Sequence, residues 1–312
     1  MSRIVKSSPE SFAEAVKILR AGGLVALPTE TVYGLAADAR NDEAVAKIFK
    51  AKGRPSHNPL IVHIFDPADL GKWAEANEMA KSLAKVFWPG PLTLVLPKVT
   101  DELSAIAGAN LSTLAIRCPE NKWSKAFKEL GFNGPIVMPS ANRSGHISPT
   151  RAQHVADDLG DQVDLIIDGG ECDNGIESTI LKIEKDRAVL LRPGVIPVED
   201  FVPYISDLRL PEKAAQTSAP GMLKSHYAPK ARVRLNAMER RSGEAYLAFG
   251  HTEVIADMNL SASADLAEAA RNLYAALRSL DKVEVIAVAP IPPHGMGAAI
   301  NDRLRRAAAD RD

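Results

Sequence analysis

The chain has 312 residues, of which 46% are hydrophobic and 25% are charged, and its formal net charge is −1. This composition is typical of a globular protein with room for two domains, and it excludes nucleic-acid binding through a global positive field. Cys118 and Cys172 are the only cysteines. They form no CxxC motif, so the sequence predicts neither a disulfide framework nor a zinc site and fits a reducing cytosol.

Membrane and export signals are the next classes to be excluded. The first ten residues contain no apolar signal core. No stretch approaches the roughly 18 apolar residues that a membrane helix requires. We therefore expect a soluble, cytoplasmic protein without membrane contact.

The first 205 residues predict one α/β domain of short strands with helices between them. Ser8 and Pro9 are expected to open the first helix, and Thr150 to cap a later helix that ends at Leu159. Further helices are expected over 42–52, 67–87 and 121–130. Strands are expected over 24–27, 60–64, 91–97, 113–117, 135–139, 164–168, 178–183 and 188–191, with a polar loop over 29–35. The pattern favours a mixed sheet wrapped on itself over a regular βαβ repeat.

The remainder of the chain predicts a linker and a second, smaller domain. Residues 206–231 lack periodicity and are expected to form the linker. Residues 232–312 contain strands over 245–250 and 283–289 and helices over 266–277 and 296–309, which indicates a small α/β domain.

A basic turn lies between the helix that begins near Asp42 and the strand at 60–64. Its cations are Lys47, Lys50, Lys52 and Arg54. Cations at a helix C-terminus also suit the macrodipole, which is the simpler explanation for Lys47 and Lys50. Prolines follow Arg54 and Asn58 and stiffen the backbone, so a guanidinium fork is presented at a fixed place that suits phosphate.

Polar residues recur within a few positions of several predicted strand ends, whereas the Walker, Rossmann, HExxH and GxSxG motifs are absent. Each polar residue alone is typical of turn chemistry. Together they indicate an anionic substrate that is handled by positioning and electrostatics. His63, inside an apolar strand, is more typical of a core histidine. The polar set is Thr31, Arg54, Asn58, Arg117, Ser140, Asn142 and Arg192.

Several of these residues belong to motifs that resemble the YrdC-like family of threonylcarbamoyl-adenylate synthases. Lys52-x-Arg54 with Ser140-x-Asn142 resembles the family tetrad. The flanking motifs are residues 28–35 (PTETVYGL), 89–93 (PGPLT), 177–180 (ESTI), 192–194 (RPG) and the linker segment 218–229 (SAPGMLKSHYAP). The resemblance covers the whole chain and implies a twisted mixed-sheet YrdC-like catalytic domain (1–205), a linker or lid (206–231) and a small Rossmann-like domain (232–312).

The resemblance also implies an activity, in which L-threonine, bicarbonate and ATP give threonylcarbamoyl-AMP and pyrophosphate. Mg²⁺ would be carried by ATP, with no ligands from protein side chains. The product would serve modification of adenosine 37 in tRNA through downstream transfer proteins, with at most a weak tRNA contact by this chain. The implied catalytic residues are Lys52, Arg54, Ser140 and Asn142. The implied ATP contacts are Arg54, Asn58, Thr113, Ser140, Asn142, Thr150, Arg192 and Tyr227, and the implied L-threonine contacts are Thr31, His63, Arg117 and Ser178.

Two further expectations and two alternatives follow from the sequence. The reacting nucleophile is a substrate carboxylate, so no enzymic nucleophile is needed. The linker folds over the nucleotide as a lid that brings Tyr227 to the ATP side of the site. The alternatives are a non-catalytic RNA-binding module that uses Lys47 to Arg54 with Arg143, and a carbamoyl-transfer module like those of hydrogenase maturation proteins. The absence of zinc-finger cysteines argues against the latter.

Overall fold

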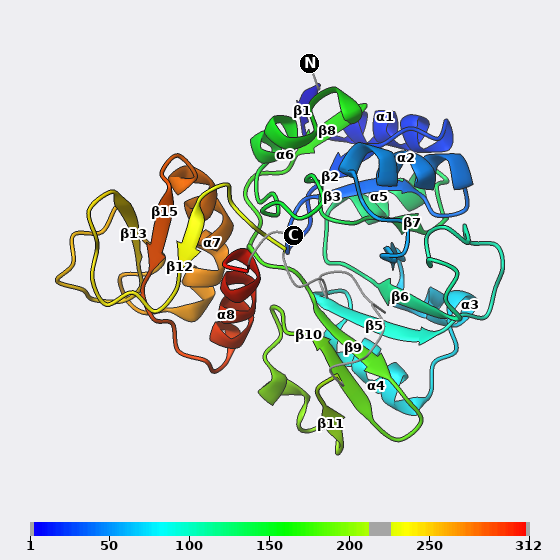
Figure 1. The fold of residues 1–312 in the computed structure, drawn as a ribbon. Coiled ribbons are helices and arrows are strands. Elements are labelled where there is room, and N and C mark those ends of the chain that lie inside the picture. The colour runs from blue at the N-terminus through cyan, green and yellow to red at the C-terminus, as the bar shows by residue number, and fades with distance from the viewer. Residues whose placement is uncertain (1–2, 212–225, 310–312) are drawn as a thin grey trace.

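The computed structural model describes residues 3–211 and 226–309, which form two domains (Figure 1). The lid expectation for 206–231 therefore falls partly on residues 212–225, outside the described ranges. None of the described helices is long and apolar enough to span a membrane.

The large domain is built on one mixed sheet, as the sequence predicts, but the sheet has eleven strands where the sequence predicts eight. Its order is β1-β8-β2-β3-β7-β4-β6-β5-β9-β10-β11, with parallel and antiparallel neighbours interspersed. The strands are β1 (Ile4–Lys6), β2 (Val25–Leu27), β3 (Gly34–Asp38), β4 (Ile61–His63), β5 (Leu92–Pro97), β6 (Thr113–Arg117), β7 (Ile136–Val137), β8 (Leu165–Asp168), β9 (Thr179–Ile183), β10 (Ala188–Arg192) and β11 (Leu208–Arg209).

Helices cover the sheet in two groups, each with its own apolar core. Phe12 and Leu19 pack with Trp123 and Phe127 in one core, whereas Val45 and Ile48 belong to the main core. The α-helices are α1 (Pro9–Arg20), α2 (Asp42–Lys52), α3 (Leu70–Trp73), α4 (Glu78–Phe87), α5 (Trp123–Glu129) and α6 (Ala152–Leu159), and short 3₁₀ turns are η1 (Pro67–Asp69), η2 (Gly160–Gln162) and η3 (Val198–Phe201).

The first two long helices begin and end where the sequence predicts. The Ser8 hydroxyl caps α1 by accepting from the Ser11 N–H at 3.2 Å. Gly53 ends α2 with φ of +58°, a conformation that glycine adopts without the steric penalty of a side chain. This cap turns the chain back toward β4, so Lys52 and Arg54 face the end of that strand.

The structure corrects two of the predicted helices. The helix predicted over 67–87 is broken, because Ala74 leaves the helix to bridge Lys98, and the Asn77 side chain then caps α4. Thr150 does not cap α6. The N-cap position is Arg151, and the buried Thr150 backbone N–H faces His154 Nδ1 at 3.3 Å instead.

The structure also corrects the predicted loop at 29–35 and the start of the linker. Gly34 and Leu35 begin β3, which pairs antiparallel with β2 and with β7. The region predicted as linker begins with β11, whose residues pair with the first residues of β10. β3 (GLAAD) does not alternate apolar and polar residues, and β11 has only two residues, so each gives little sequence signal.

The C-terminal domain is a four-stranded parallel sheet in the order β12-β15-β13-β14 with two helices. Its elements are β12 (Arg232–Arg234), β13 (Glu244–Ala248), β14 (Met258–Asn259), α7 (Leu266–Leu280), β15 (Val285–Val288) and α8 (Met296–Ala307). In Figure 1, α8 is the helix of this domain that faces β10 of the large domain. One apolar cluster crosses the boundary and joins Ile176 and Val195 to Leu273, Ile300 and Leu304.

Candidate active site

A small cavity of about 50 Å³ lies where several strands of the large sheet end. His63 ends β4 and pairs in register with Arg117, which ends β6, while Ser140 follows β7 and Arg192 ends β10. Polar side chains at strand ends are thus brought together from distant parts of the sequence. The predicted residues that line the cavity are Thr31, Lys52, Arg54, His63, Arg117, Ser140, Asn142, Ser178, Arg192 and Tyr227.

Three predicted ATP contacts lie outside this lining. Asn58 is buried behind Arg54 and accepts from its guanidinium at 2.7 Å. Thr113 begins β6, roughly 13 Å from Arg117 at the usual rise along a strand. Thr150 lies beside α6, where its N–H meets His154.

One wall of the cavity presents two buried cations without a carboxylate partner among the described residues. Lys52 Nζ donates to the carbonyls of Ser140 and Asn142, both at 2.5 Å. Arg54 Nη2 donates to Asn58 Oδ1 at 2.7 Å and to the Pro59 carbonyl at 2.9 Å. Burial, together with the charge of Arg54, holds the pKa of Lys52 well below its usual value, and burial lowers the pKa of Arg54 to about 10. Both shifts express the cost of burying positive charge that no carboxylate in the described ranges compensates.

Arg192 reaches the same cavity from β10. Its Nε and Nη2 donate to the Ser178 carbonyl at 3.1 and 3.0 Å, and Nη2 lies 3.1 Å from Ser178 Oγ. That hydroxyl also shares a hydrogen bond with Thr93 Oγ1 at 2.8 Å. Burial lowers the pKa of Arg192. The guanidinium therefore fixes Ser178 while adding positive charge to the cavity.

A second part of the lining, the paired wall of Arg117 and Thr31, holds its cation in an ion pair. Arg117 Nη2 donates to Glu30 Oε1 at 2.6 Å and to Thr31 Oγ1 at 3.0 Å, and both members of the ion pair are buried. Glu30 Oε2 is buried without a hydrogen-bond partner in the described part of the chain. Thr31 Oγ1 also lies 2.8 Å from Thr29 Oγ1. A carboxylate that sequence reasoning had not assigned thus orients the arginine and, through it, Thr31.

His63 is both a buried strand residue and part of the cavity lining. Its Nδ1 lies 3.1 Å from the Ile61 carbonyl, and burial with the charge of Arg117 holds its pKa well below the usual value. The ring is therefore neutral, with Nδ1 donating and Nε2 free to accept. The core-histidine interpretation and the binding-site interpretation are compatible here.

Several polar atoms of the lining have no hydrogen-bond partner in ranges 3–211 and 226–309. They are Asn142 Oδ1, His226 Nδ1 and Tyr227 OH, all buried. Buried polar groups are normally satisfied, so such atoms at a cavity indicate a missing ligand. Tyr227 enters from the end of the linker with φ of +60°, and its ring meets His226 with centroids 4.1 Å apart.

The cluster around Glu177 was missed by sequence reasoning. Glu177 lines the cavity and accepts from Ser148, Tyr274 and Arg303, the last two of which belong to the C-terminal domain. One signal was available: Arg303 occupies a core-facing position of α8, between Ile300 and Leu304, where an apolar residue is typical. No local pattern pairs that arginine with a glutamate 126 positions away.

The surface patch required by the RNA-binding alternative is only partly formed. Lys52 and Arg54 are buried at the cavity, Lys47 donates to the Gly22 carbonyl, and Arg143 donates to the Asp158 carbonyl. Lys47, Lys50 and Arg143 remain exposed at the surface. The structure therefore removes two of the five cations on which this alternative depends, Lys52 and Arg54.

Two family models match the chain. The Sua5, YciO and YrdC model, described as "Telomere recombination", matches residues 17–194, and the model of the threonylcarbamoyl-AMP synthase C-terminal domain matches residues 187–309. The chain therefore belongs to the two-domain Sua5 family of the YrdC-like proteins.

Relatives resemble the chain over nearly its whole length. The threonylcarbamoyl-AMP synthase of Bacillus subtilis is 42% identical, across 98% of this chain and 95% of the relative. That of Pyrococcus abyssi is 41% identical, across 95% and 94%. The crystal structure of P. abyssi Sua5 complexed with L-threonine matches with a TM-score of 0.89 at 39% identity and covers 99% of this chain and 97% of that one. The predicted fold class is thereby confirmed.

Proposed function

We infer that the chain is a threonylcarbamoyl-AMP synthase, a nucleotidyltransferase that uses ATP and L-threonine. The observation that carries this inference is the full-length similarity to synthases, joined to a cavity in which two buried cations, Lys52 and Arg54, have no carboxylate partner among the described residues. The C-terminal match to a synthase domain favours this function over carbamoyl transfer of the hydrogenase-maturation type.

We propose bicarbonate as the third substrate. The threonine amine adds to bicarbonate with loss of water, and the resulting N-carboxylate attacks the α-phosphate of ATP. A carboxylate–phosphate bond forms, the bond to the β-phosphate oxygen breaks, and pyrophosphate leaves. Negative charge grows on the phosphoryl and leaving groups, and the cations Lys52, Arg54 and Arg192 offset it. No enzymic nucleophile is required.

The threonine side of the site is assigned to Thr31, His63, Arg117 and Ser178. The neutral His63 can accept from the substrate hydroxyl, while Arg117 offers a guanidinium to the carboxylate without losing its bond to Glu30. Ser178, held by Arg192, adds a hydroxyl. The support for this assignment is that all four side chains line one cavity.

The ATP side is assigned to Arg54, Asn58, Thr113, Ser140, Asn142, Thr150, Arg192 and Tyr227, with Lys52, Arg54, Ser140 and Asn142 as the catalytic set. The unpartnered Asn142 Oδ1 and Tyr227 OH support it, since each can bond a nucleotide. Thr113 and Thr150 lie outside the lining and carry the weakest support, and Asn58 acts through Arg54.

We propose that Mg²⁺ enters as part of the MgATP substrate. The cavity lining offers cations to a triphosphate, and its carboxylate, Glu177, already accepts from Ser148, Tyr274 and Arg303. When bound, the ion would shield the β- and γ-phosphate oxygens of the leaving group. The chain's own task is to hold the α-phosphate and the incoming carboxylate in line.

The remaining expectations stay proposals. We propose the division into 1–205, 206–231 and 232–312, with the middle segment as a lid that brings Tyr227 to the nucleotide. The product would pass to downstream proteins that modify adenosine 37 of tRNA, with at most weak tRNA contact by this chain. A cytoplasmic location is supported by the two free, buried cysteines.

Incubation with ATP, L-threonine and bicarbonate tests the function. AMP and pyrophosphate should appear together, and their release should depend on threonine and on bicarbonate. Mass spectrometry should detect threonylcarbamoyl-AMP at early times. ATP hydrolysis that is indifferent to threonine would contradict the proposal.

A further inference from the structure

The loop that carries Glu177 and Ser178 is held from outside by the C-terminal domain. A side chain at Gly175 would lie 2.5 Å from the backbone of Arg271 in α7, so the loop and the helix are in direct backbone contact. Arg271 Nε also donates to the Asp173 carbonyl at 2.8 Å. The loop therefore takes its position from α7 as well as from the large sheet.

Side chains of both domains donate hydrogen bonds to the Glu177 carboxylate. Ser148 Oγ of the large domain donates to Oε1 at 2.6 Å, Tyr274 OH of α7 lies 3.0 and 2.9 Å from the two carboxylate oxygens, and Arg303 Nε of α8 donates to Oε2 at 2.8 Å. Arg303 is fully buried. Ionic hydrogen bonds of this kind fix geometry strongly in a site that excludes water.

The same two residues hold the tyrosine at the end of the linker. Arg303 Cζ lies 5.1 Å from the centre of the Tyr227 ring, and Tyr274 stacks on that ring with centroids 5.8 Å apart. Arg303 Nη1 also donates to the Pro193 carbonyl at 2.8 Å, next to Arg192. One arginine of α8 thus contacts three segments whose side chains line the cavity.

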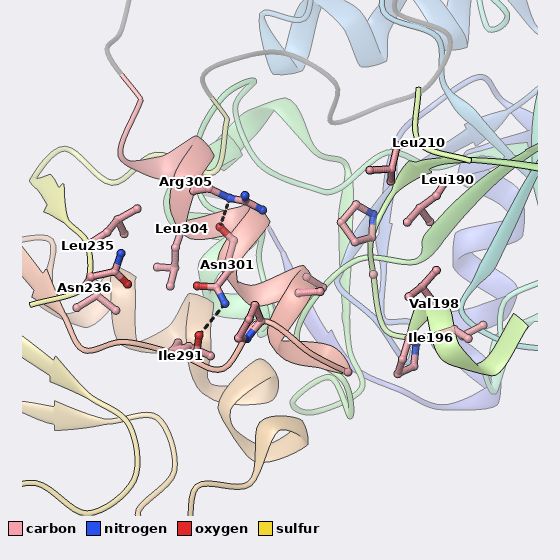
Figure 2. Close-up of a pocket in the computed structure, with 18 of the residues that line it drawn as sticks. Leu190, Ile196, Val198, Leu210, Leu235, Asn236, Ile291, Asn301, Leu304 and Arg305 are labelled. Atoms are coloured by element: carbon pink, nitrogen blue, oxygen red, sulfur yellow. Dashed lines mark hydrogen bonds between the residues drawn. The ribbon is translucent and has the colours of Figure 1, made fainter. Parts of the chain in front are cut away.

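Beside these contacts, α8 borders a cavity between the two domains. Its volume is about 710 Å³, and it is lined by Leu190, Ile196 and Val198 on one side and by Leu235, Ile291 and Leu304 on the other (Figure 2). Arg305, two residues beyond Arg303, lines this cavity and bonds the Asn301 carbonyl of its own helix. Arg303 is the side chain of α8 that bonds Glu177 and the Pro193 carbonyl, and the Arg306 carbonyl of the same helix accepts from the His226 N–H.

We propose that Arg303 and Tyr274 are positioning residues of the adenylate-forming site, through which the C-terminal domain fixes Glu177, Tyr227 and the loop of Ser178. The inference rests on the proposed synthase function. It predicts that the large domain alone has an incomplete site even when it is folded.

The first test compares Arg303→Met with Arg305→Met on the same helix. Loss of Arg303 should lower kcat/KM for threonine and ATP on the order of 10²-fold, as misplacement of positioned groups does. Arg305→Met should stay within about twofold of the wild type, because Arg305 is exposed. Arg303→Lys keeps the positive charge but lacks the planar guanidinium, so its kcat/KM should be about tenfold higher than that of Arg303→Met.

The pH profile separates positioning from a merely structural role. The pKa of Glu177 lies at about 2 because the charges of Arg303 and Arg192 outweigh its burial. In Arg303→Met burial dominates and the pKa rises, so activity should fall at a higher pH than in the wild type as the carboxylate protonates. In a protein that already carries Glu177→Gln, Arg303→Met should not shift the acidic limb of the pH–activity profile. The titratable groups facing Glu177 are Arg192 of β10, His226 and Tyr227 of the linker end, Tyr274 of α7 and Arg303 of α8.

Tyr274→Phe covers the case in which Arg303→Met melts below the assay temperature. It keeps the stacked ring and removes the hydroxyl that donates to Glu177, and should cost about tenfold in kcat/KM with a smaller loss of thermal stability. An inactive wild type would overturn the function itself. The positioning role alone would be overturned if the wild type is active, Arg303→Met or Tyr274→Phe has the same kcat/KM as Arg305→Met, and the acidic limb of the pH–activity profile does not shift.

Discussion

The two walls of the cavity differ in whether a buried positive charge is paired with a carboxylate. On one wall, Arg117 is paired with Glu30 at 2.6 Å, as Arg303 is with Glu177 nearby. On the other wall, Lys52 and Arg54 donate to carbonyl and amide oxygens and have no carboxylate partner among the described residues.

This difference separates a cation whose charge is already compensated from cations whose charge is available to the phosphates of ATP. A paired arginine such as Arg117 has a fixed orientation and can still donate hydrogen bonds to a substrate carboxylate through its remaining N–H groups. A buried cation that is held only by neutral oxygens lowers the stability of the folded protein, because burial disfavours the charged form. The lowered pKa values of Lys52 and Arg54 reflect this cost. Binding of a phosphate group supplies a counter-charge for these cations and offsets the cost of burying them. The following predictions test this comparison, from the largest expected effect to the smallest.

Discrimination between substrates should be the largest effect. Valine matches threonine in shape but lacks the hydroxyl, so polar atoms around Thr31, His63 and Ser178 would be left unpaired. We expect kcat/KM for valine to be lower on the order of 10⁴-fold. L-Serine, which keeps the hydroxyl, serves as the control and should be rejected less. Comparable AMP release with valine and threonine would show that the pocket is not built this way.

Lys52→Met should lower turnover on the order of 10³-fold, because a fixed charge beside the phosphates is lost. Its melting temperature should stay equal or rise, since an unpaired buried charge disappears. Pyrophosphate release and thermal melting together check both parts. Lys50→Met, an exposed neighbour on α2, should leave both unchanged. A large drop in the melting temperature of Lys52→Met would place Lys52 with the structural wall.

Arg54→Lys should lower turnover on the order of 10²-fold while the protein remains folded. A lysine keeps the charge but cannot bond Asn58, Pro59 and the substrate at once, as the planar fork does. Turnover and melting are measured on the same preparation. Near-wild-type turnover would remove Arg54 from the catalytic set.

Glu30→Gln tests the paired wall through stability. Arg117 would be left buried without its counter-charge, which should cost about 3 kcal/mol of unfolding free energy. Denaturant titration measures the loss. The exposed pair of Lys81 and Glu78 is the control, and Glu78→Gln should change stability by less than about 1 kcal/mol. Equal losses in the two variants would remove the distinction between the walls.

Local signals in the sequence predicted much of the large domain. The strand at 113–117 and the helix at 42–52 are confirmed because apolar runs and helix ends are encoded within a few residues. β3 was missed because Gly34–Asp38 is composed mainly of small residues and becomes a strand only between β2 and β7. Tertiary pairing, which no short window contains, decided that element.

The site residues likewise divide into those that sequence motifs identify and those whose contacts depend on the tertiary structure. Family motifs located Lys52, Arg54 and their partners, which now line one cavity. Glu30 stood inside a recognised motif, but its pairing with Arg117 spans 87 positions and depends on strand order. The contacts of Glu177 with α7 and α8 depend on how two domains dock, and nothing local to either sequence specifies that.

The short strands at the two edges of the large sheet affect how the domain can be cut. β1 has three residues and β11 has two, so little unpaired backbone is presented to other molecules. A fragment ending at residue 205 would lose β11 and the Asp207 carbonyl that accepts from the Ala188 N–H. The open edge of β10 would then be free to pair with a second molecule. A fragment ending at residue 211 keeps this edge covered and is the better choice for studying the large domain as a monomer.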